Sequence, residues 1–307
     1  GLWDYTDDPP AYDITPSNRE AAVRNMQEHF VDAPWAHRSV LPWPAESDFD
    51  KEGRLAASLD FSNLRRWISR WPDARWYCIF LAVGNGRFVG VGCTEEPFTA
   101  RVASWARAVA SEVRRLGKDP GQFALLILDE PHSREQDRII LHWARALKKG
   151  CPEFVIWEDP TYRNPHKEAL KEAYEACDVL CPNLGIFLSG TEEAQRFYLD
   201  LVNDGKRSLW FYQCTGPARL LDPQAYHRLQ AWYCFRWGAV GSGFWAYGDA
   251  GGSAWNVYAA GRTIYSPVYL EKESVTDGKH FEAVREGLED YQYLVMVKDF
   301  ADKAADG

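Results

Sequence analysis

The sequence predicts an α/β protein of the (β/α)8 barrel type that ends in one long helix. Short apolar or aromatic segments alternate with longer helical segments along the 307 residues. Strict strand–helix alternation is typical of parallel strands joined by right-handed crossovers. Polar and aromatic residues stand at the carboxyl ends of nearly all predicted strands, and in a barrel those ends share one rim. An open doubly wound sheet is the alternative.

Eight strands are expected, and each is followed by a helical segment or a loop. The strands are predicted at residues 1–6, 38–43, 75–84, 123–130, 153–158, 178–183, 207–214 and 242–248. The helices are predicted at 17–30, 62–71, 97–116, 133–150, 165–177, 191–202, 222–237 and 277–304. Ser133 and Thr191 are expected N-caps, because their hydroxyls can accept a hydrogen bond from the first turn. Eight such units in about 250 residues match the usual size of this barrel.

Charge and hydropathy exclude two classes of partner. The net charge is −9 and no run of Lys and Arg occurs, which argues against nucleic-acid binding. No apolar stretch approaches the ~20 residues that span a bilayer, so no membrane partner is expected. Neither property predicts the oligomeric state or the compartment.

Cysteine and glycine patterns predict no metal and no cofactor. The seven cysteines lie mostly in apolar segments and are expected to be buried free thiols, and Cys177 and Cys181 lack the second pair that a zinc site needs. The segment "VGNGRFVGVG" (83–92) carries two glycines after a strand. It continues with strand-like alternation instead of a helix, so a hairpin is favoured over a dinucleotide-binding loop.

Aromatic residues are abundant, with 14 Trp, 15 Tyr and 15 Phe. They could form a large core, or they could line a sugar-binding cleft in which ring faces stack on pyranose rings. The candidate substrate-binding residues lie at or just after predicted strand ends: Trp157, Asn183, Tyr212, Trp245, Tyr247 and Trp255.

The strongest signal for chemistry is the adjacent pair Asp129 and Glu130 in "LLILDEP" (125–131). On a regular strand the two side chains would point to opposite faces. At a strand end that leads into Pro131, the second can turn back so that both carboxyls face one ligand. Proximity would then raise one pKa, giving the acid and the anion that glycoside hydrolysis uses. The alternative is a solvated pair in which Glu130 helps to cap the next helix.

Several motifs together resemble glycoside hydrolase family 123 and its uncharacterised relatives. They are "LDEPH", "DVLCPN", "GSGFWAYGD", "SAWNVY" and "REGLEDYQYL", and the similarity extends from about residue 120 onward. The resemblance implies a retaining, substrate-assisted β-N-acetylgalactosaminidase that is secreted or periplasmic. Asp129 would orient the substrate's acetamido group, whose oxygen attacks the anomeric carbon, and Glu130 would act as general acid/base. The terminal helical motif is expected to be structural.

We therefore expect residues 1–307 to form a single catalytic barrel, trimmed from a longer protein with an upstream β-sandwich. The expected activity is that of an exo-β-N-acetylhexosaminidase acting on a glycan or glycoside. Two alternatives stay open. One is a carbohydrate-binding barrel without turnover, and the other is a glycosidase of another sugar that pairs Glu130 with a distant acid such as Glu158 or Asp249.

Overall fold

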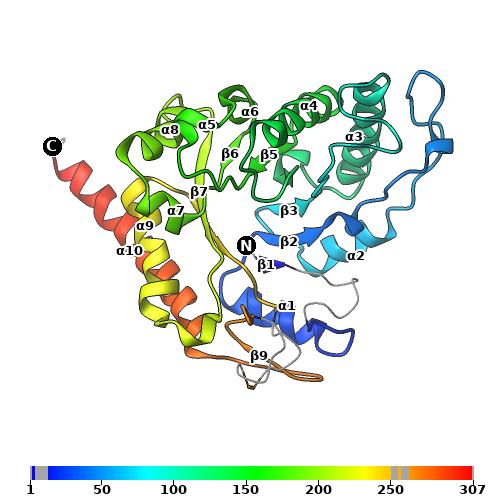
Figure 1. The fold of residues 1–307 in the computed structure, drawn as a ribbon. Helices are drawn as coiled ribbons and strands as arrows, with labels where there is room; N and C mark the ends of the chain where they lie inside the picture. Colours follow the sequence, from blue (N-terminus) through cyan, green and yellow to red (C-terminus); the bar gives the residue numbers. More distant parts are fainter. Residues whose placement is uncertain (1, 4–12, 250–254, 257–262, 306–307) are drawn as a thin grey trace. The chain divides into compact units, whose positions relative to one another are not determined.

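The computed structural model describes residues 2–3, 13–249, 255–256 and 263–305 (Figure 1). The chain divides into two compact units. One comprises Ala33–Ser208, and the other comprises Gly1–Asp32 with Leu209–Gly307. Of the "SAWNVY" segment, the structure describes only Trp255 and Asn256.

The unit Ala33–Ser208 is built on parallel strands that neighbour one another in sequence order. They are β2 (Pro34–His37), β3 (Tyr77–Phe80), β4 (Phe123–Leu126), β5 (Val155–Glu158) and β6 (Val179–Leu180). Every residue of β3 and β4 is buried. Continuous apolar segments such as "YCIF" and "FALL" are expected where both faces of a parallel sheet are covered.

The helices of this unit follow the strands along the chain. They are α2 (Ser62–Arg70), α3 (Phe98–Arg115), α4 (Arg134–Gly150), α5 (Pro165–Glu168), α6 (Lys171–Glu175), α7 (Leu184–Ser189) and α8 (Glu192–Val202). Helix α4 contacts both α3 and α6 (Figure 1). The side chains of Ser133 and Thr191 accept hydrogen bonds from the backbone of Gln136 and Ala194, which confirms both predicted caps.

The other unit holds β1 (Leu2–Trp3), α1 (Arg19–Glu28) and the elements from β7 (Ser208–Gln213) onward. These are a π-helical turn (Gln224–Arg228), α9 (Leu229–Trp237), β8 (Gly241–Phe244), β9 (Tyr269–Leu270), β10 (Val275–Thr276) and α10 (Lys279–Ala305). Strands β7 and β8 pair in parallel, and β9 and β10 pair antiparallel. The predicted long C-terminal helix is confirmed as α10.

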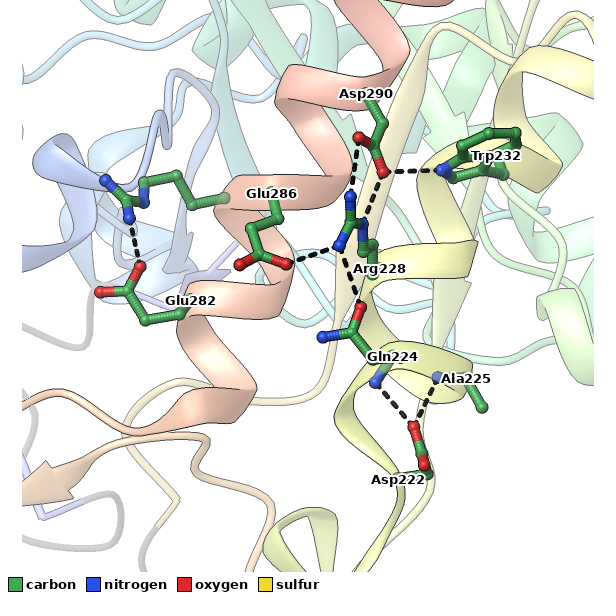
Figure 2. A network of polar contacts seen from close by, with 9 residues as sticks. Asp222, Gln224, Ala225, Arg228, Trp232, Glu282, Glu286 and Asp290 are labelled. Atoms are coloured by element: carbon green, nitrogen blue, oxygen red, sulfur yellow. Dashed lines mark hydrogen bonds and ion pairs between the residues drawn. The ribbon is translucent and has the colours of Figure 1, made fainter.

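A network of hydrogen bonds and ion pairs connects the first half of α10 to the π-helical turn and to α9 (Figure 2). Arg228 donates to Asp290 through Nε at 2.6 Å and to Glu286 through Nη1 at 2.9 Å. The indole of Trp232 also donates to Asp290, at 2.8 Å. A Cβ added at Gly287 would lie 2.7 Å from the Arg228 carbonyl oxygen, so this helix approaches the turn closely. The structural role predicted for the terminal motif is consistent with these contacts.

Two predicted elements differ from the structure because of specific side-chain hydrogen bonds. Residues 38–43 do not form a strand, because the strand lies at Pro34–His37 and Arg38–Val40 form a 3-10 turn. The His37 side chain accepts from the Ser39 amide at 3.3 Å and starts that turn. The helix predicted at 165–177 is divided into α5 and α6. Its interruption is at Leu170, whose amide donates to the Asp137 carboxylate at 2.7 Å instead of to the preceding helical turn.

Helix α7 and the β9–β10 hairpin were not predicted, and the predicted strand 123–130 is shorter at its carboxyl end. The hairpin expected in residues 83–92 is present as an antiparallel bridge between Phe88 and Val91. Among the described residues, none of the helices combines the length and the apolar character needed to cross a membrane.

Candidate active site

The loop after β4 carries the two adjacent acids. Hydrogen bonding continues one residue beyond the strand, where the Ile127 carbonyl accepts from the Val83 amide at 2.9 Å. Three residues later, Glu130 has a φ of +49°, in the left-handed region that residues with a side chain seldom adopt. This turn ends the strand's alternation at the position where the sequence predicted that the second carboxyl would change direction.

Residues at the end of β5 hold this loop in place. The Asp159 carboxylate accepts from the Glu130 amide at 2.9 Å, and the Glu158 carboxylate accepts from the Ile127 amide at 2.9 Å. The Thr161 amide donates to the Pro131 carbonyl at 3.1 Å. The strained turn at Glu130 is therefore supported by groups from the next strand, as expected where a backbone conformation of high energy is retained.

The acids around this turn have unusual proton affinities. Glu158 and Asp159 are buried, and desolvation raises the pKa of each well above its usual value, with the charge of Asp129 adding to the effect. The pKa of Asp129 is raised to about 6, first by desolvation and then by the charge of Glu130, while a hydrogen bond with Asp159 opposes the rise. Asp129 is nevertheless an exposed residue. The arrangement therefore combines an exposed acid of raised pKa with two buried acids whose pKa values are also raised.

Asp137 on α4 fixes the segment that follows these acids. Its buried carboxylate accepts from the Tyr162 and Tyr174 hydroxyls, each at 2.8 Å, and from the Leu170 amide. Three donors satisfy this acid, although desolvation still raises its pKa. Asp137 thus orders the connection between β5 and α6, which begins at Asp159.

Two of the candidate substrate-binding residues, Trp157 and Asn183, lie in the unit Ala33–Ser208 and have structural roles there. Trp157 is fully buried, and its ring packs against Trp35 and Phe80 with centroid distances of 5.2 and 5.3 Å. Its ring faces are covered, so the expectation of an exposed sugar platform at Trp157 is corrected to a core position. The Asn183 side chain accepts from the Ile186 amide at 3.2 Å and caps α7.

The candidates on β7 and after β8 belong to the other unit. Tyr212 is buried, and Trp245 is half-buried, with its indole 3.3 Å from the Asp249 carboxylate. Tyr247 is fully buried, and its hydroxyl donates to the Asn25 side chain at 2.8 Å. Tyr247 is therefore a core residue that fastens α1, and the expectation that it lines a ligand cavity is corrected.

Trp255 is the most exposed of the candidate substrate-binding residues, with 62% of its surface accessible to solvent. Its ring stacks on Tyr269 at a centroid distance of 4.5 Å. The Arg219 guanidinium lies 4.5 Å from the same tyrosine ring. An exposed indole on a fixed stack is a suitable face for a pyranose ring, so Trp255 stays a predicted substrate-binding residue.

Asp159 was not among the candidate site residues, whereas the structure gives it a direct hydrogen bond to the candidate catalytic loop. The available signal was the second acidic pair, Glu158 and Asp159, at the end of the next predicted strand. Two acidic pairs after neighbouring parallel strands are expected at the same edge of the sheet.

Comparisons with known proteins inform the fold alone. No family model and no curated protein matches the chain. Among solved structures, the endo-1,4-beta-D-mannanase of Thermotoga petrophila is 12% identical, with a TM-score of 0.57 over 93% of this chain and 98% of that one. The endoglucanase Cel5A of Pseudomonas stutzeri is 13% identical, with a TM-score of 0.53 over 90% and 89%. A GH5-4 endoglucanase of Ruminococcus champanellensis, solved with bound cellotriose, is 8% identical, with a TM-score of 0.53 over 92% and 91%.

These similarities confirm the predicted fold class. The chain has a (β/α)8 fold like that of glycoside hydrolases, together with a long C-terminal helix. The resemblance to family 123 is supported only to that coarser level, since the three proteins named are endoglucanases and a mannanase.

Proposed function

We propose that this chain is a glycoside hydrolase whose reaction takes place at Asp129 and Glu130. The observation that carries the proposal is the loop after β4, which presents an exposed aspartate with a pKa of about 6 beside a glutamate on a strained turn. Strain and perturbed proton affinity in one loop are typical of sites selected for chemistry. The fold shared with endoglucanases and a mannanase supports a carbohydrate as substrate.

Glycoside cleavage needs a proton for the leaving oxygen and stabilisation of an oxocarbenium-like centre. In this proposal Glu130 gives the proton and later activates water, while Asp129 acts as the anion. The buried acids Glu158 and Asp159 hold the loop from below.

For the substrate, we propose a β-linked N-acetylhexosamine at the non-reducing end, by analogy with the family 123 motifs. Asp129 would accept a hydrogen bond from the N–H of the 2-acetamido group, and the acetamido oxygen would attack the anomeric carbon. An internal nucleophile gains effective molarity without forming a covalent bond to the enzyme. The adjacent acid pair supports this scheme, because both groups must reach one sugar ring.

The alternative pairing of Glu130 with Glu158 is disfavoured. Glu158 is fully buried, and one of its oxygens already accepts from the Ile127 amide. A sugar could reach this carboxyl only after the loop had moved. A binding role without turnover is an outcome of the experiment below, and a glycosidase that pairs Glu130 with Asp249 is left open if plain and N-acetyl sugars turn over equally.

The test is a screen of nitrophenyl glycosides in which each N-acetyl sugar is compared with its plain counterpart. Glu130→Gln is expected to lower turnover of substrates with poor leaving groups by roughly 10²–10⁴-fold, and to affect nitrophenyl glycosides less. Asp129→Asn is expected to impair both kinds of substrate. Glu135→Gln, an exposed acid in the first turn of α4, is the matched control and should leave turnover unchanged.

The outcomes distinguish the acetamide mechanism, glycosidase activity in general and the location of the site. Equal turnover of plain and N-acetyl sugars would overturn the acetamide mechanism and leave a glycosidase. Sugar binding without hydrolysis would support a binding barrel instead. Full activity in both Asp129→Asn and Glu130→Gln would remove the site from this loop altogether.

A further inference from the structure

A second cluster of polar groups lies where the end of α1 meets the connection from β10 to α10. It consists of His29, which follows α1, Asp277, which follows β10, and Glu282 in the first turn of α10. All three belong to the unit formed by Gly1–Asp32 and Leu209–Gly307. The two acids are partly exposed, whereas the His29 side chain is only 4% exposed.

The environment of His29 fixes which ring nitrogen carries a hydrogen. Nδ1 lies 2.7 Å from the Asn25 carbonyl oxygen, which can only accept, so Nδ1 is the donor. In the neutral ring this leaves a lone pair on Nε2. Among the residues that the structure describes, no group forms a hydrogen bond with Nε2, although the atom is buried. The ring also stacks on Phe281 at 4.2 Å, which holds its orientation.

The buried nitrogen points at the two carboxylates. Nε2 is 3.6 Å from Glu282 Oε1 and 3.8 Å from Asp277 Oδ1, and the three ligand atoms lie within 4.8 Å of one another. The two distances from His29 Nε2 are longer than N–H···O hydrogen bonds, which lie at 2.7–3.2 Å. They are close to the separation of about 3.3–3.5 Å between ligands that share a tetrahedral ion with bonds of about 2.0–2.1 Å.

Each of the three groups is also oriented by a neighbour, as is usual around metal ligands. The Asn25 amide donates to Asp277 Oδ1, and the buried Tyr247 hydroxyl in turn fixes Asn25. Arg285 binds the other oxygen of Glu282 at 2.6 Å, so Oε1 remains directed at His29. Figure 2 shows Glu282 on α10, one turn before Glu286. Two carboxylates and one guanidinium leave one net negative charge, which favours a cation.

We infer that His29, Asp277 and Glu282 form a binding site for a divalent transition-metal ion, with further positions left for water. One imidazole and two carboxylates suit Zn²⁺, Co²⁺ and Mn²⁺ better than the all-oxygen preference of Ca²⁺. The ion would join α1 to the start of α10 and so stabilise the native state by binding it selectively. Sequence spacing did not predict this cluster, because its residues come from three separate segments.

Cobalt is the sharpest probe, because its absorption reports the ligand type. The protein comprising residues 1–307 is stripped with a chelator and titrated with Co²⁺, and with Zn²⁺ by calorimetry. One ion per chain is expected, without the near-ultraviolet charge-transfer bands that thiolate ligands produce. The absence of those bands would exclude the free cysteines as ligands, of which Cys214 is exposed. The melting temperature is expected to rise with Zn²⁺ and to fall again with chelator.

Three variants test the ligands: His29→Gln, Asp277→Asn and Glu282→Gln. Each should weaken binding at least about tenfold, as loss even of an outer partner does at metal sites, and should abolish the shift in melting temperature. The controls are Glu289→Gln, an exposed acid on α10, and His166→Gln, an exposed histidine, and both should bind as the wild type does. Glu282 is partly exposed, so its variant keeps the test valid if His29→Gln fails to fold. Unchanged affinity in Glu282→Gln, thiolate bands, or no binding at millimolar metal would overturn the inference.

Discussion

Glu112 provides the most quantitative prediction about stability. This residue of α3 lies between two arginines, and it accepts from Arg65 Nε at 2.6 Å and from Arg115 Nε at 2.7 Å. Its side chain is only 8% exposed. Replacement by Gln keeps the shape and removes the charge, leaving two guanidinium groups without their anion. We expect Glu112→Gln to destabilise the protein at neutral pH.

The magnitude follows from proton affinity. The pKa of Glu112 is lowered from 4.5 to about 2, chiefly by hydrogen bonding from Arg115 and then from Arg65, while desolvation opposes the change. That difference corresponds to roughly 3 kcal/mol. Both arginines are about half exposed, so solvent screening reduces the expected loss to about 1–2 kcal/mol. Since the folded-state pKa is depressed, the stabilisation is complete above about pH 5 and disappears as pH falls from 4.5 through 2.

Urea unfolding at pH 7 and pH 3 measures both features. At pH 3 the variant should lose less than half of what it loses at pH 7. Glu153→Gln is the matched control, because Glu153 pairs with the neighbouring Arg114 at 2.7 Å but both side chains are half exposed. The control should change the unfolding free energy by less than about 0.5 kcal/mol. Equal losses for Glu112→Gln and Glu153→Gln at pH 7, or a loss that does not change with pH, would refute the reasoning.

Three further predictions concern the site and the helix packing. The pH–rate profile should fall on the acid side near pH 6, since protonation of Asp129 removes the anion, and an acid limb far below pH 5 would contradict that role. Trp255→Ala should raise KM for oligosaccharides and leave the melting temperature unchanged, whereas an unchanged KM would exclude stacking at that ring. Gly150→Ala should destabilise the protein by about 1–3 kcal/mol in urea unfolding. Its Cβ would lie 2.4 Å from the Ala103 carbonyl oxygen of α3, and equal stability would show that the helices can separate freely.

The sequence predicted well those elements that local pattern determines. The fully apolar segments of β3 and β4 and the capped start of α4 at Ser133 are signals carried by consecutive residues. The turn at Glu130 was also expected, because two acids and Pro131 cannot continue a buried strand. The fold class followed from the alternation of such segments.

Residues whose role depends on distant partners were predicted less well. A place at or just after a strand end suggested that the aromatic candidates face the rim, but it did not indicate whether they are covered there. In the structure, Trp157 and Tyr247 are core residues and not surface platforms. Asp159 was not predicted as a site residue, because its hydrogen bond to Glu130 joins two loops separated by a whole helix. Leu170 interrupts a helix because of Asp137, a partner in another element.

The backbone conformation at Glu130 lowers the stability of the fold, whereas the glutamate side chain is needed for the proposed reaction. A glutamate in the left-handed region costs the fold about 1–3 kcal/mol, and an asparagine or glycine would accept the same conformation at lower cost. Selection for stability alone would therefore remove the carboxyl that the proposed reaction requires. A thermostable version of this protein obtained without an activity screen would be expected to carry a substitution at position 130, and one obtained with that screen would have to find its stabilising changes elsewhere.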